Sequence, residues 1–161
     1  MTLLANHPER AETSALLRKN IVLRRLPAPA FGELEPLLAI VDYRKGDVLL
    51  TQGAHDMEQY FVIDGVLKRV VSNPEGKEMI LRFAKEDDME TSYAAWRLRT
   101  PAPYSIRAVT KARVAKLPLP QWAAFLDAHP ELAERVPKKE LASYLNLSAE
   151  TLSRLKHAGK I

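Results

Sequence analysis

Apolar residues recur at two different intervals along this chain, and the interval changes near residue 43. Within residues 9–26 the leucines and isoleucine recur at helical spacing, which predicts a helix over this stretch. Prolines then punctuate a turn, and a short helix is predicted over residues 31–40. The first quarter of the chain is therefore expected to be mainly helical.

From Tyr43 onward the apolar residues fall into short runs rich in Val, Ile, Tyr and Phe. Turn signals separate these runs at intervals of roughly 8 to 12 residues, which is typical of a β-sandwich or barrel. The predicted strands are residues 47–51, 59–64, 66–72, 78–84, 104–110 and 112–117.

Glycines mark the reversals between these strands. Gly46, Gly53, Gly65 and Gly76 each stand in a turn-like sequence, where a tight reversal needs a positive φ that residues with a Cβ adopt only at a cost. The pattern indicates a compact antiparallel roll.

The pattern becomes helical again after the last predicted strand. Pro118 and Pro120 bar the continuation of a central strand, and residues 122–136 are predicted to form a helix interrupted before Pro130. Residues 137–159 then contain two short amphipathic stretches joined at residues 146–148.

Composition narrows the function classes. At 161 residues the chain is long enough for one good-sized domain, or for one domain with a small appendage. It contains no Cys, which excludes disulfides, thiolate metal sites and a Cys nucleophile, and fits a reducing compartment. Since no apolar run is long enough for a membrane span and no signal peptide is recognisable, a cytoplasmic protein is expected, with no membrane partner.

The positive charge gathers at the C-terminal end. The net charge is +4, and residues 135–161 hold six Lys and Arg against two Glu, which accounts for the whole excess. Such a segment indicates either a nucleic-acid contact or a solvated helix surface, and charge alone does not separate the two.

Three segments carry a resemblance to a known family: residues 45–84 (KGDVLLTQGAHDMEQYFVIDGVLKRVVSNPEGKEMILRFA), 106–118 (IRAVTKARVAKLP) and 140–155 (ELASYLNLSAETLSRL). In this order they resemble the Crp/Fnr family of bacterial transcription regulators. The resemblance implies an α+β protein with an antiparallel β-roll (double-stranded β-helix, jelly roll), flanking helices and a small C-terminal helix-turn-helix domain. The expected domains are a cyclic-nucleotide-binding-like effector roll with N-terminal helices over residues 1–120, and a helical connector with the helix-turn-helix over residues 121–161.

Family members that bind cyclic nucleotide carry Gly-Glu and, further along, an Arg before a small hydroxyl residue. The Glu takes the ribose hydroxyl and the Arg neutralises the cyclic phosphate. Here Glu90-Thr91 and Ala102-Pro103 stand at those positions, so the close-approach Gly and the phosphate Arg are both missing. Cyclic nucleotide is therefore not expected to bind, no cofactor is expected, and the effector is unknown.

The same region offers a candidate effector pocket. Arg99 lies three residues before the expected Arg position and could reach a phosphate through a shifted turn, while Tyr93 and Trp96 could line a pocket for an apolar effector. A surface Arg and aromatic residues of the core are the simpler explanation of the same pattern. The candidate pocket residues are Met89, Glu90, Thr91, Tyr93, Trp96 and Arg99.

Other sensing or catalytic chemistry finds little support. The iron–sulfur sensors of the family need Cys, and the four His residues lack the paired spacing of haem or metal ligands. No catalytic nucleophile or acid/base pair stands out, so the chain is not expected to be an enzyme.

Residues 137–159 are predicted to form a helix-turn-helix. Pro137 suits the first turn of a helix, and Asn146 tolerates the left-handed conformation of the turn. Ser148 is a good N-cap for the second helix.

The second helix has the residues of a DNA-reading helix. An α-helix fits the major groove, where Arg154 can donate two hydrogen bonds to guanine and Glu150 can accept one from cytosine. The alternative is an ordinary Glu-to-Arg pair on a helix surface, worth about 0.2 to 0.5 kcal/mol. Because the segment resembles the family's reading helix we favour base readout, although Ala149 stands where many relatives have Arg. The expected DNA-binding residues are Lys138, Lys139, Ser148, Ala149, Glu150, Thr151, Ser153, Arg154 and Lys156.

Family members place a long dimerisation helix between the roll and the helix-turn-helix. Only 23 residues separate Leu117 from Leu141, too few for such a helix beside the other elements. We expect a stretch to be missing near Pro120 to Phe125; a shortened protein that dimerises in another way is the alternative.

The sequence thus favours a homodimeric, sequence-specific DNA-binding regulator of the Crp/Fnr type. Its expected partners are a palindromic double-stranded operator and a second copy of the chain, with a small-molecule effector and RNA polymerase as further candidates. The alternative is a small-molecule-binding roll that regulates through protein contacts. The operator, the effector and the direction of regulation are not readable from the sequence.

Overall fold

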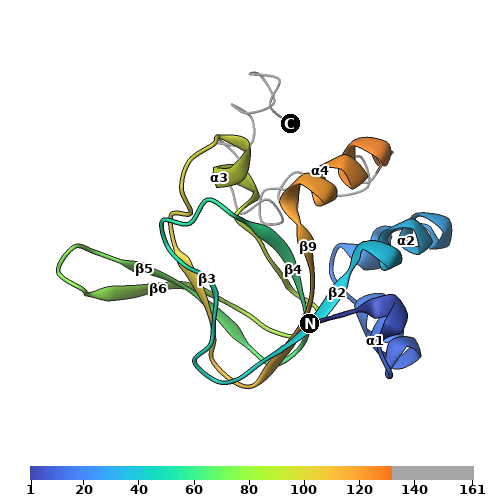
Figure 1. Ribbon diagram of the computed structural model, residues 1–161, viewed down its shortest axis with the longest axis horizontal. Coiled ribbons are helices and arrows are strands. Elements are labelled where there is room, and N and C mark those ends of the chain that lie inside the picture. The colour runs from blue at the N-terminus through green and yellow to red at the C-terminus, as the bar shows by residue number, and fades with distance from the viewer. Residues whose placement is uncertain (132–161) are drawn as a thin grey trace.

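The computed structural model describes residues 1–131, which form a β-roll of two antiparallel sheets with helices against one side (Figure 1). One sheet has the strand order β1-β2-β9-β4-β7 and the other β3-β8-β5-β6. The strands are β1 Thr2–Leu3, β2 Ala39–Tyr43, β3 Val48–Leu50, β4 Glu58–Asp64, β5 Leu67–Ser72, β6 Glu78–Ala84, β7 Met89–Glu90, β8 Ser105–Ala108 and β9 Ala112–Pro118. The helices are α1 Arg10–Leu17, α2 Ala28–Leu34, α3 Tyr93–Arg97 and α4 Leu119–Ala128, with 3-10 turns at Leu4–Asn6, Leu23–Arg25 and Glu35–Leu37.

The five-stranded sheet is covered on both faces. β4 buries five consecutive side chains, from Gln59 to Ile63, which requires cover on both sides of the strand. Trp122 of α4 provides part of that cover, because it is fully buried and meets Phe61 edge-on at 5.4 Å between ring centroids. The Trp122 ring also stacks on Phe125 at 5.5 Å. Helix α4 is therefore part of the core of the roll.

The predicted antiparallel roll is confirmed. The six predicted strands agree with β3, β4, β5, β6, β8 and β9 to within two residues at each end. All four predicted turn glycines have positive φ, between 81° and 94°. The requirement is strictest at Gly65, where a Cβ would lie 2.8 Å from Ala112 Cα, so no larger residue fits between β4 and β5.

The predicted helix over residues 9–26 is wrong in its second half. Helix α1 ends at Leu17, and the side chain of Asn20 then organises the chain. Its Oδ1 accepts hydrogen bonds from the N–H groups of Val22 and Leu23 at 2.9 and 3.3 Å, while its Nδ2 donates to the carbonyl of Asp88 at 3.0 Å. A side chain that takes over backbone hydrogen bonds competes with a continuing helix.

The predicted helix over residues 31–40 is wrong at its C-terminal end. Helix α2 ends at Leu34, a 3-10 turn follows, and Ala39 already begins strand β2. Strand β2 was not predicted, because a short apolar run after Pro36 fits a helix end as well as a strand. Strands β1 and β7 were also missed, since two residues each carry no periodicity.

Helix α4 occupies the segment predicted to be a helix over residues 122–136. It begins three residues earlier, at Leu119, and ends at Ala128, before Pro130 as predicted. The predicted domain boundary at residue 120 and the predicted join near Pro120 to Phe125 both fall within this helix. The helix-turn-helix over residues 137–159 lies outside the described residues and stays a prediction.

Candidate effector site

A buried ion pair joins the two sheets inside the roll. The side chains of Glu90, on β7, and Arg69, on β5, are 0% and 4% exposed, and Nη2 of Arg69 donates to Oε1 of Glu90. The second carboxylate oxygen lies 3.6 Å from Nε of Arg82 on β6. Because β7 belongs to one sheet while β5 and β6 belong to the other, this cluster connects the sheets across the interior.

Neighbouring polar groups hold the pair in place. The guanidinium carbon of Arg69 lies 4.2 Å from the ring centroid of Tyr104, whose hydroxyl donates to the carbonyl of Thr91. The N–H of Thr91 donates to Oε1 of Glu90 at 3.2 Å, and Gln59 Nε2 donates to the Glu90 carbonyl at 3.2 Å. Burial lowers the pKa of Arg69 to about 10, which leaves the guanidinium charged at neutral pH.

Glu90 of this pair lies at the start of the segment that corresponds to the family's phosphate cassette, the stretch from Gly-Glu to Arg with which relatives hold a cyclic nucleotide. Glu90 stands where relatives that bind cyclic nucleotide have Gly, and the anion beside Arg69 is the protein's own carboxylate. A buried cation needs such a partner, since leaving it alone would carry a large desolvation cost.

Sequence reasoning missed Arg69. One signal could have found it: an arginine within the apolar run of residues 66–72, two residues after Leu67 and so on the same inward face of the strand.

The six residues predicted for the effector pocket fall into two groups. Four are buried in the roll: Met89, Glu90, Thr91 and Tyr93. There, Thr91 Oγ1 accepts from the N–H of Tyr93 at 3.0 Å at the start of α3, and burial raises the pKa of the Tyr93 hydroxyl. The remaining two, half-buried Trp96 and exposed Arg99, lie together in a pocket on the surface.

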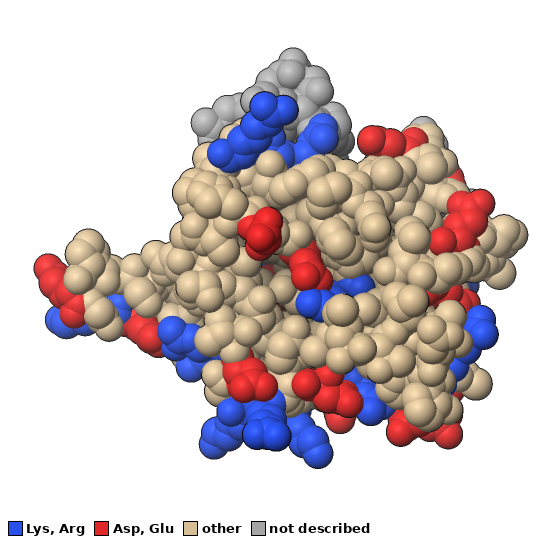
Figure 2. Space-filling model, in the orientation of Figure 1, with Lys and Arg blue, Asp and Glu red and all other residues tan. Residues whose placement is uncertain are grey.

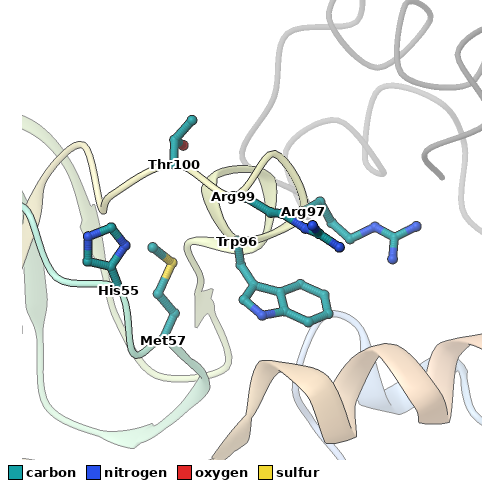
Figure 3. A pocket seen from close by; sticks show the side chains of 6 residues that line it. All are labelled: His55, Met57, Trp96, Arg97, Arg99 and Thr100. Atoms are coloured by element: carbon teal, nitrogen blue, oxygen red, sulfur yellow. The ribbon is translucent and has the colours of Figure 1, made fainter.

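This surface pocket lies between α3, the loop that follows it and the turn before β4 (Figure 3). Its volume is about 470 Å³. The lining residues are His55, Met57, Trp96, Arg97, Arg99 and Thr100. His55 and Met57 stand opposite Trp96 across the opening (Figure 3). In the space-filling view, Lys and Arg atoms gather over the part of the molecule where α3 lies (Figure 2).

Arg99 has an unusual backbone conformation. Its φ is 58°, in the left-handed region, which costs a residue with a Cβ about 1 to 2 kcal/mol. Its N–H donates to the carbonyl of Trp96 at 3.1 Å, so the turn that closes α3 also sets Arg99 beside Trp96. The pocket thus combines an aromatic face with a cation, a chemistry that suits a flat organic anion.

The predicted DNA-binding residues lie outside the described part of the chain: Lys138, Lys139, Ser148, Ala149, Glu150, Thr151, Ser153, Arg154 and Lys156. Within residues 1–131, no group of three or more His, Cys, Asp or Glu side chains is placed to hold a metal ion. None of the helices in this part has the length and apolarity that crossing a membrane requires.

Residues 40–129 match the family model of the cyclic nucleotide-binding domain. This match covers more than half of the chain. The chain belongs to the cyclic nucleotide-binding domain family. The cyclic-nucleotide-binding-like roll that the resemblance implied is thereby confirmed, whereas the Crp/Fnr family and the helix-turn-helix stay predictions. Structurally similar chains include domains of transcription regulators.

Several solved structures share the fold of this chain. The sensor domain of the transcriptional regulator DNR from Pseudomonas aeruginosa is 22% identical, with a TM-score of 0.69 and coverage of 95% of both chains. The N-terminal domain of a transcriptional regulator from Streptomyces coelicolor is 22% identical, with a TM-score of 0.60 and coverage of 89% of this chain and 94% of that one. The regulatory subunit of a cAMP-independent protein kinase A from Trypanosoma brucei is 16% identical, with a TM-score of 0.67 and coverage of 83% and 50%.

Curated relatives are much longer than this chain. Patatin-like phospholipase domain-containing protein 6 of mouse and human is 27% identical over 139 residues. The match spans 83% of this chain and 10% of the relative. The chain therefore spans about a tenth of the length of these curated relatives.

Proposed function

We propose that this protein is a homodimeric, sequence-specific DNA-binding regulator of the Crp/Fnr type whose roll works without cyclic nucleotide. The observation that carries the proposal is the order of its parts. A sensor-type roll is followed by residues 140–155, which resemble the family's DNA-reading helices. The likeness of the roll to the DNR sensor domain over 95% of both chains supports the first part. Glu150 and Arg154 supply the base contacts in this proposal.

The Arg69–Glu90 pair supports independence from cyclic nucleotide. A cyclic phosphate entering the roll would need an unpaired cation, whereas Arg69 is already neutralised by a carboxylate that is fully buried. A second anion beside Glu90 would be repelled, and breaking the pair would leave a buried charge uncompensated. Ligand entry would therefore have to overcome the interaction that holds the two sheets together.

The surface pocket is the proposed effector site. Trp96 provides the aromatic face, and Arg99 provides a cation for which the described residues form no ion pair or hydrogen bond through the side chain. A volume of about 470 Å³ is sufficient for a small organic molecule. The proposed effector class is a flat organic anion.

Binding measurements test the two statements about ligands. Calorimetry with cyclic AMP and cyclic GMP is expected to show no binding to the wild-type chain. Phenyl phosphate, used as a flat organic anion, is expected to change the fluorescence of Trp96, because it would lie against that ring in the pocket. The other tryptophan, Trp122, is buried in the core, so its fluorescence is expected to stay unchanged. Arg99→Gln should weaken this response, whereas Trp96→Phe removes the reporter and should abolish the signal. Saturable binding of a cyclic nucleotide, or a phenyl phosphate response unchanged in Arg99→Gln, contradicts the proposal.

Selection of bound DNA from a random pool tests the proposed sequence-specific DNA binding. The wild-type chain is expected to enrich a palindrome, and Arg154→Ala is expected to lose preference at one position in each half-site, a cost of about 1 to 3 kcal/mol. Titrations across salt should show a steep fall in affinity, since phosphate contacts release counterions. The absence of any enriched palindrome with either protein contradicts DNA readout.

A second candidate function is a regulatory module that acts through protein contacts. It is favoured by a specific observation: strand β6 exposes four large apolar side chains at a sheet edge, a surface suited to binding protein. The salt titration separates the candidates, because a docking module predicts a slope near zero with DNA.

A further inference from the structure

The outer edge of β6 exposes an apolar surface that the other described residues leave uncovered. Met79, Ile80, Leu81 and Phe83 are 62%, 48%, 48% and 57% exposed. Strand β6 ends the order β3-β8-β5-β6, so within residues 1–131 one of its edges has no strand beside it. The β5–β6 hairpin projects from the body of the molecule, with charged atoms at its tip (Figure 1, Figure 2). An open edge with large apolar side chains is suited to pairing with another strand.

A β-bulge decides which side chains of β6 share a face. Val70 of β5 lies opposite Ile80, and Lys68 lies opposite Phe83. Lys68 and Val70 are two residues apart and therefore share a face, so Ile80 and Phe83 also share one. The register shifts between these pairs, which makes Leu81 the extra residue of the bulge.

The same reasoning places charges on that face. Ser72 lies opposite Glu78 and is two residues after Val70, so Glu78 shares the face with Ile80. Lys85 is the first residue after the strand, and continuing the alternation from Phe83 by two residues would place it on that face. The face therefore presents, in chain order, an acid, two apolar side chains and a base.

We propose that β6 pairs antiparallel with β6 of a second copy, about a twofold axis between Leu81 and Arg82. In this register Ile80 lies opposite Phe83 of the partner subunit, and Glu78 lies opposite the partner subunit's Lys85. The bulge brings these pairs onto one face, and the symmetry makes each pair occur twice. Free N–H and C=O groups of both edges then find partners in a continuous sheet.

The choice of a second copy as the partner follows from this self-complementarity. Moving the axis by one residue toward the N-terminus sets Phe83 against Glu78, and moving it the other way sets Ile80 against Lys85. Either shift places an apolar side chain opposite a charge, so one register is favoured over its neighbours. This interface would join the two copies of the proposed homodimer, so the inference rests on the proposed function. The residues that carry it all belong to β6 or directly follow it.

Engineered cysteines test the register, and the natural absence of Cys gives a clean background. In the full chain, Ile80→Cys combined with Phe83→Cys is expected to form a covalent dimer on mild oxidation, because directly opposite positions meet the distances of a disulfide. Mixing the two single variants is expected to give the mixed dimer, whereas Ile80→Cys alone crosslinks slowly. Equal crosslinking by the single and double variants overturns the register.

Sedimentation of the full chain at concentrations from about 1 to 500 µM measures the association itself. Glu78→Lys and Lys85→Glu are each expected to weaken the dimer about tenfold, and the double reversal is expected to restore it. Because Glu78 also forms an ion pair with Arg107 at 2.8 Å, melting curves of each variant check that folding is retained.

Ile80→Glu is expected to give a folded monomer, while Leu16→Glu, at an exposed leucine of α1, leaves the dimer unchanged. A chain that is monomeric throughout, or a dimer indifferent to all β6 variants, overturns the proposal. No DNA is present in these experiments, so failure of the interface and failure of DNA binding give different results.

Discussion

Arg69 and Arg99 place the same functional group in two opposite environments of one domain. Arg69 lies inside the roll, paired with a fully buried carboxylate and packed on an aromatic ring. Arg99 is exposed at the rim of an open pocket, in a backbone conformation that arginine adopts at a cost. The side chain of Arg69 is fixed by its contacts, whereas the backbone of Arg99 has a conformation that is unfavourable for arginine.

This difference teaches where a domain of this kind can bind an anion. A cation that is neutralised by the protein's own carboxylate contributes to folding and leaves no charge for a ligand. A cation on the surface contributes little to folding and stays available. The interior of this roll therefore has the shape of a cyclic nucleotide-binding domain without a free positive charge at Arg69.

Removing the buried carboxylate is expected to have the largest effect. Glu90→Gln keeps the shape but leaves the charge of Arg69 uncompensated, so the free energy of unfolding should fall by about 3 to 5 kcal/mol. Urea denaturation measures it. The matched control Glu12→Gln, at an exposed acid of α1, should change stability by no more than about 0.5 kcal/mol.

The double variant Arg69→Met with Glu90→Leu sharpens this test. Replacing both charges by apolar side chains of similar volume should recover most of the loss. If Glu90→Gln and Glu12→Gln are equally mild, the ion pair does not hold the interior together.

The turn that leads into β5, the strand of Arg69, gives the next largest effect. Gly65→Ala adds a Cβ close to the backbone of Ala112 at a positive φ, so a loss of more than about 2 kcal/mol is expected. Gly46→Ala has a similar φ of 89° but open space around it, so only the conformational cost of about 1 kcal/mol applies. Thermal melting of both variants measures the difference, and equal losses would show that the close approach does not matter.

Replacing Arg99 by glycine, which tolerates a positive φ, is expected to change the free energy of unfolding less and in the opposite direction. Arg99→Gly removes the cost of the left-handed conformation but adds chain entropy to the unfolded state, so stability should stay the same or rise by up to about 1 kcal/mol. Urea denaturation compares it with the wild type. A clear loss of stability would mean that the exposed arginine also supports the fold, and the contrast with Arg69 would disappear.

The smallest expected effect lies at the end of α4. Burial alone would lower the pKa of His129, but hydrogen bonds from its ring nitrogens to Glu33 and Glu131, at 2.6 and 3.1 Å, raise it above the ordinary value. A raised pKa in the folded state gives stability that is fully present below the unfolded value, about 6.5, and is lost as the pH rises through the folded value. His129→Gln should therefore lower the melting temperature more at about pH 5.5 than at about pH 9. The exposed His55→Gln serves as control, and a difference that does not change with pH contradicts the coupling.

Most of the roll could be predicted from the sequence, because its main strands are short runs rich in Val, Ile, Tyr and Phe, and glycines with positive φ stand at four of the turns between strands. The errors are at elements whose local pattern is ambiguous or too short. The segment after α1 is fixed in part by a hydrogen bond from Asn20 to Asp88, 68 residues away in the chain, and β7 is a strand only because it pairs with β4. Such partners cannot be recognised from a local window.

The candidate site was predicted in part and for a similar reason. The degenerate cassette drew attention to residues 89–99, and Trp96 and Arg99 do share a pocket with His55 and Met57 from the other side. The partner of Glu90 was not foreseen, because Arg69 is 21 residues earlier and in the other sheet.

The sequence alone determined that this chain folds as an antiparallel roll with terminal helices, because short β-rich runs, positive-φ glycines and prolines act locally. It also determined that Cys chemistry is absent and that the cassette lacks its Gly and Arg. Only the tertiary structure decided that Glu90 neutralises Arg69, that Arg99 shares a pocket with Trp96, and that β6 has an open apolar edge. Those facts depend on which distant strands become neighbours, and that outcome is fixed by the packing of two sheets.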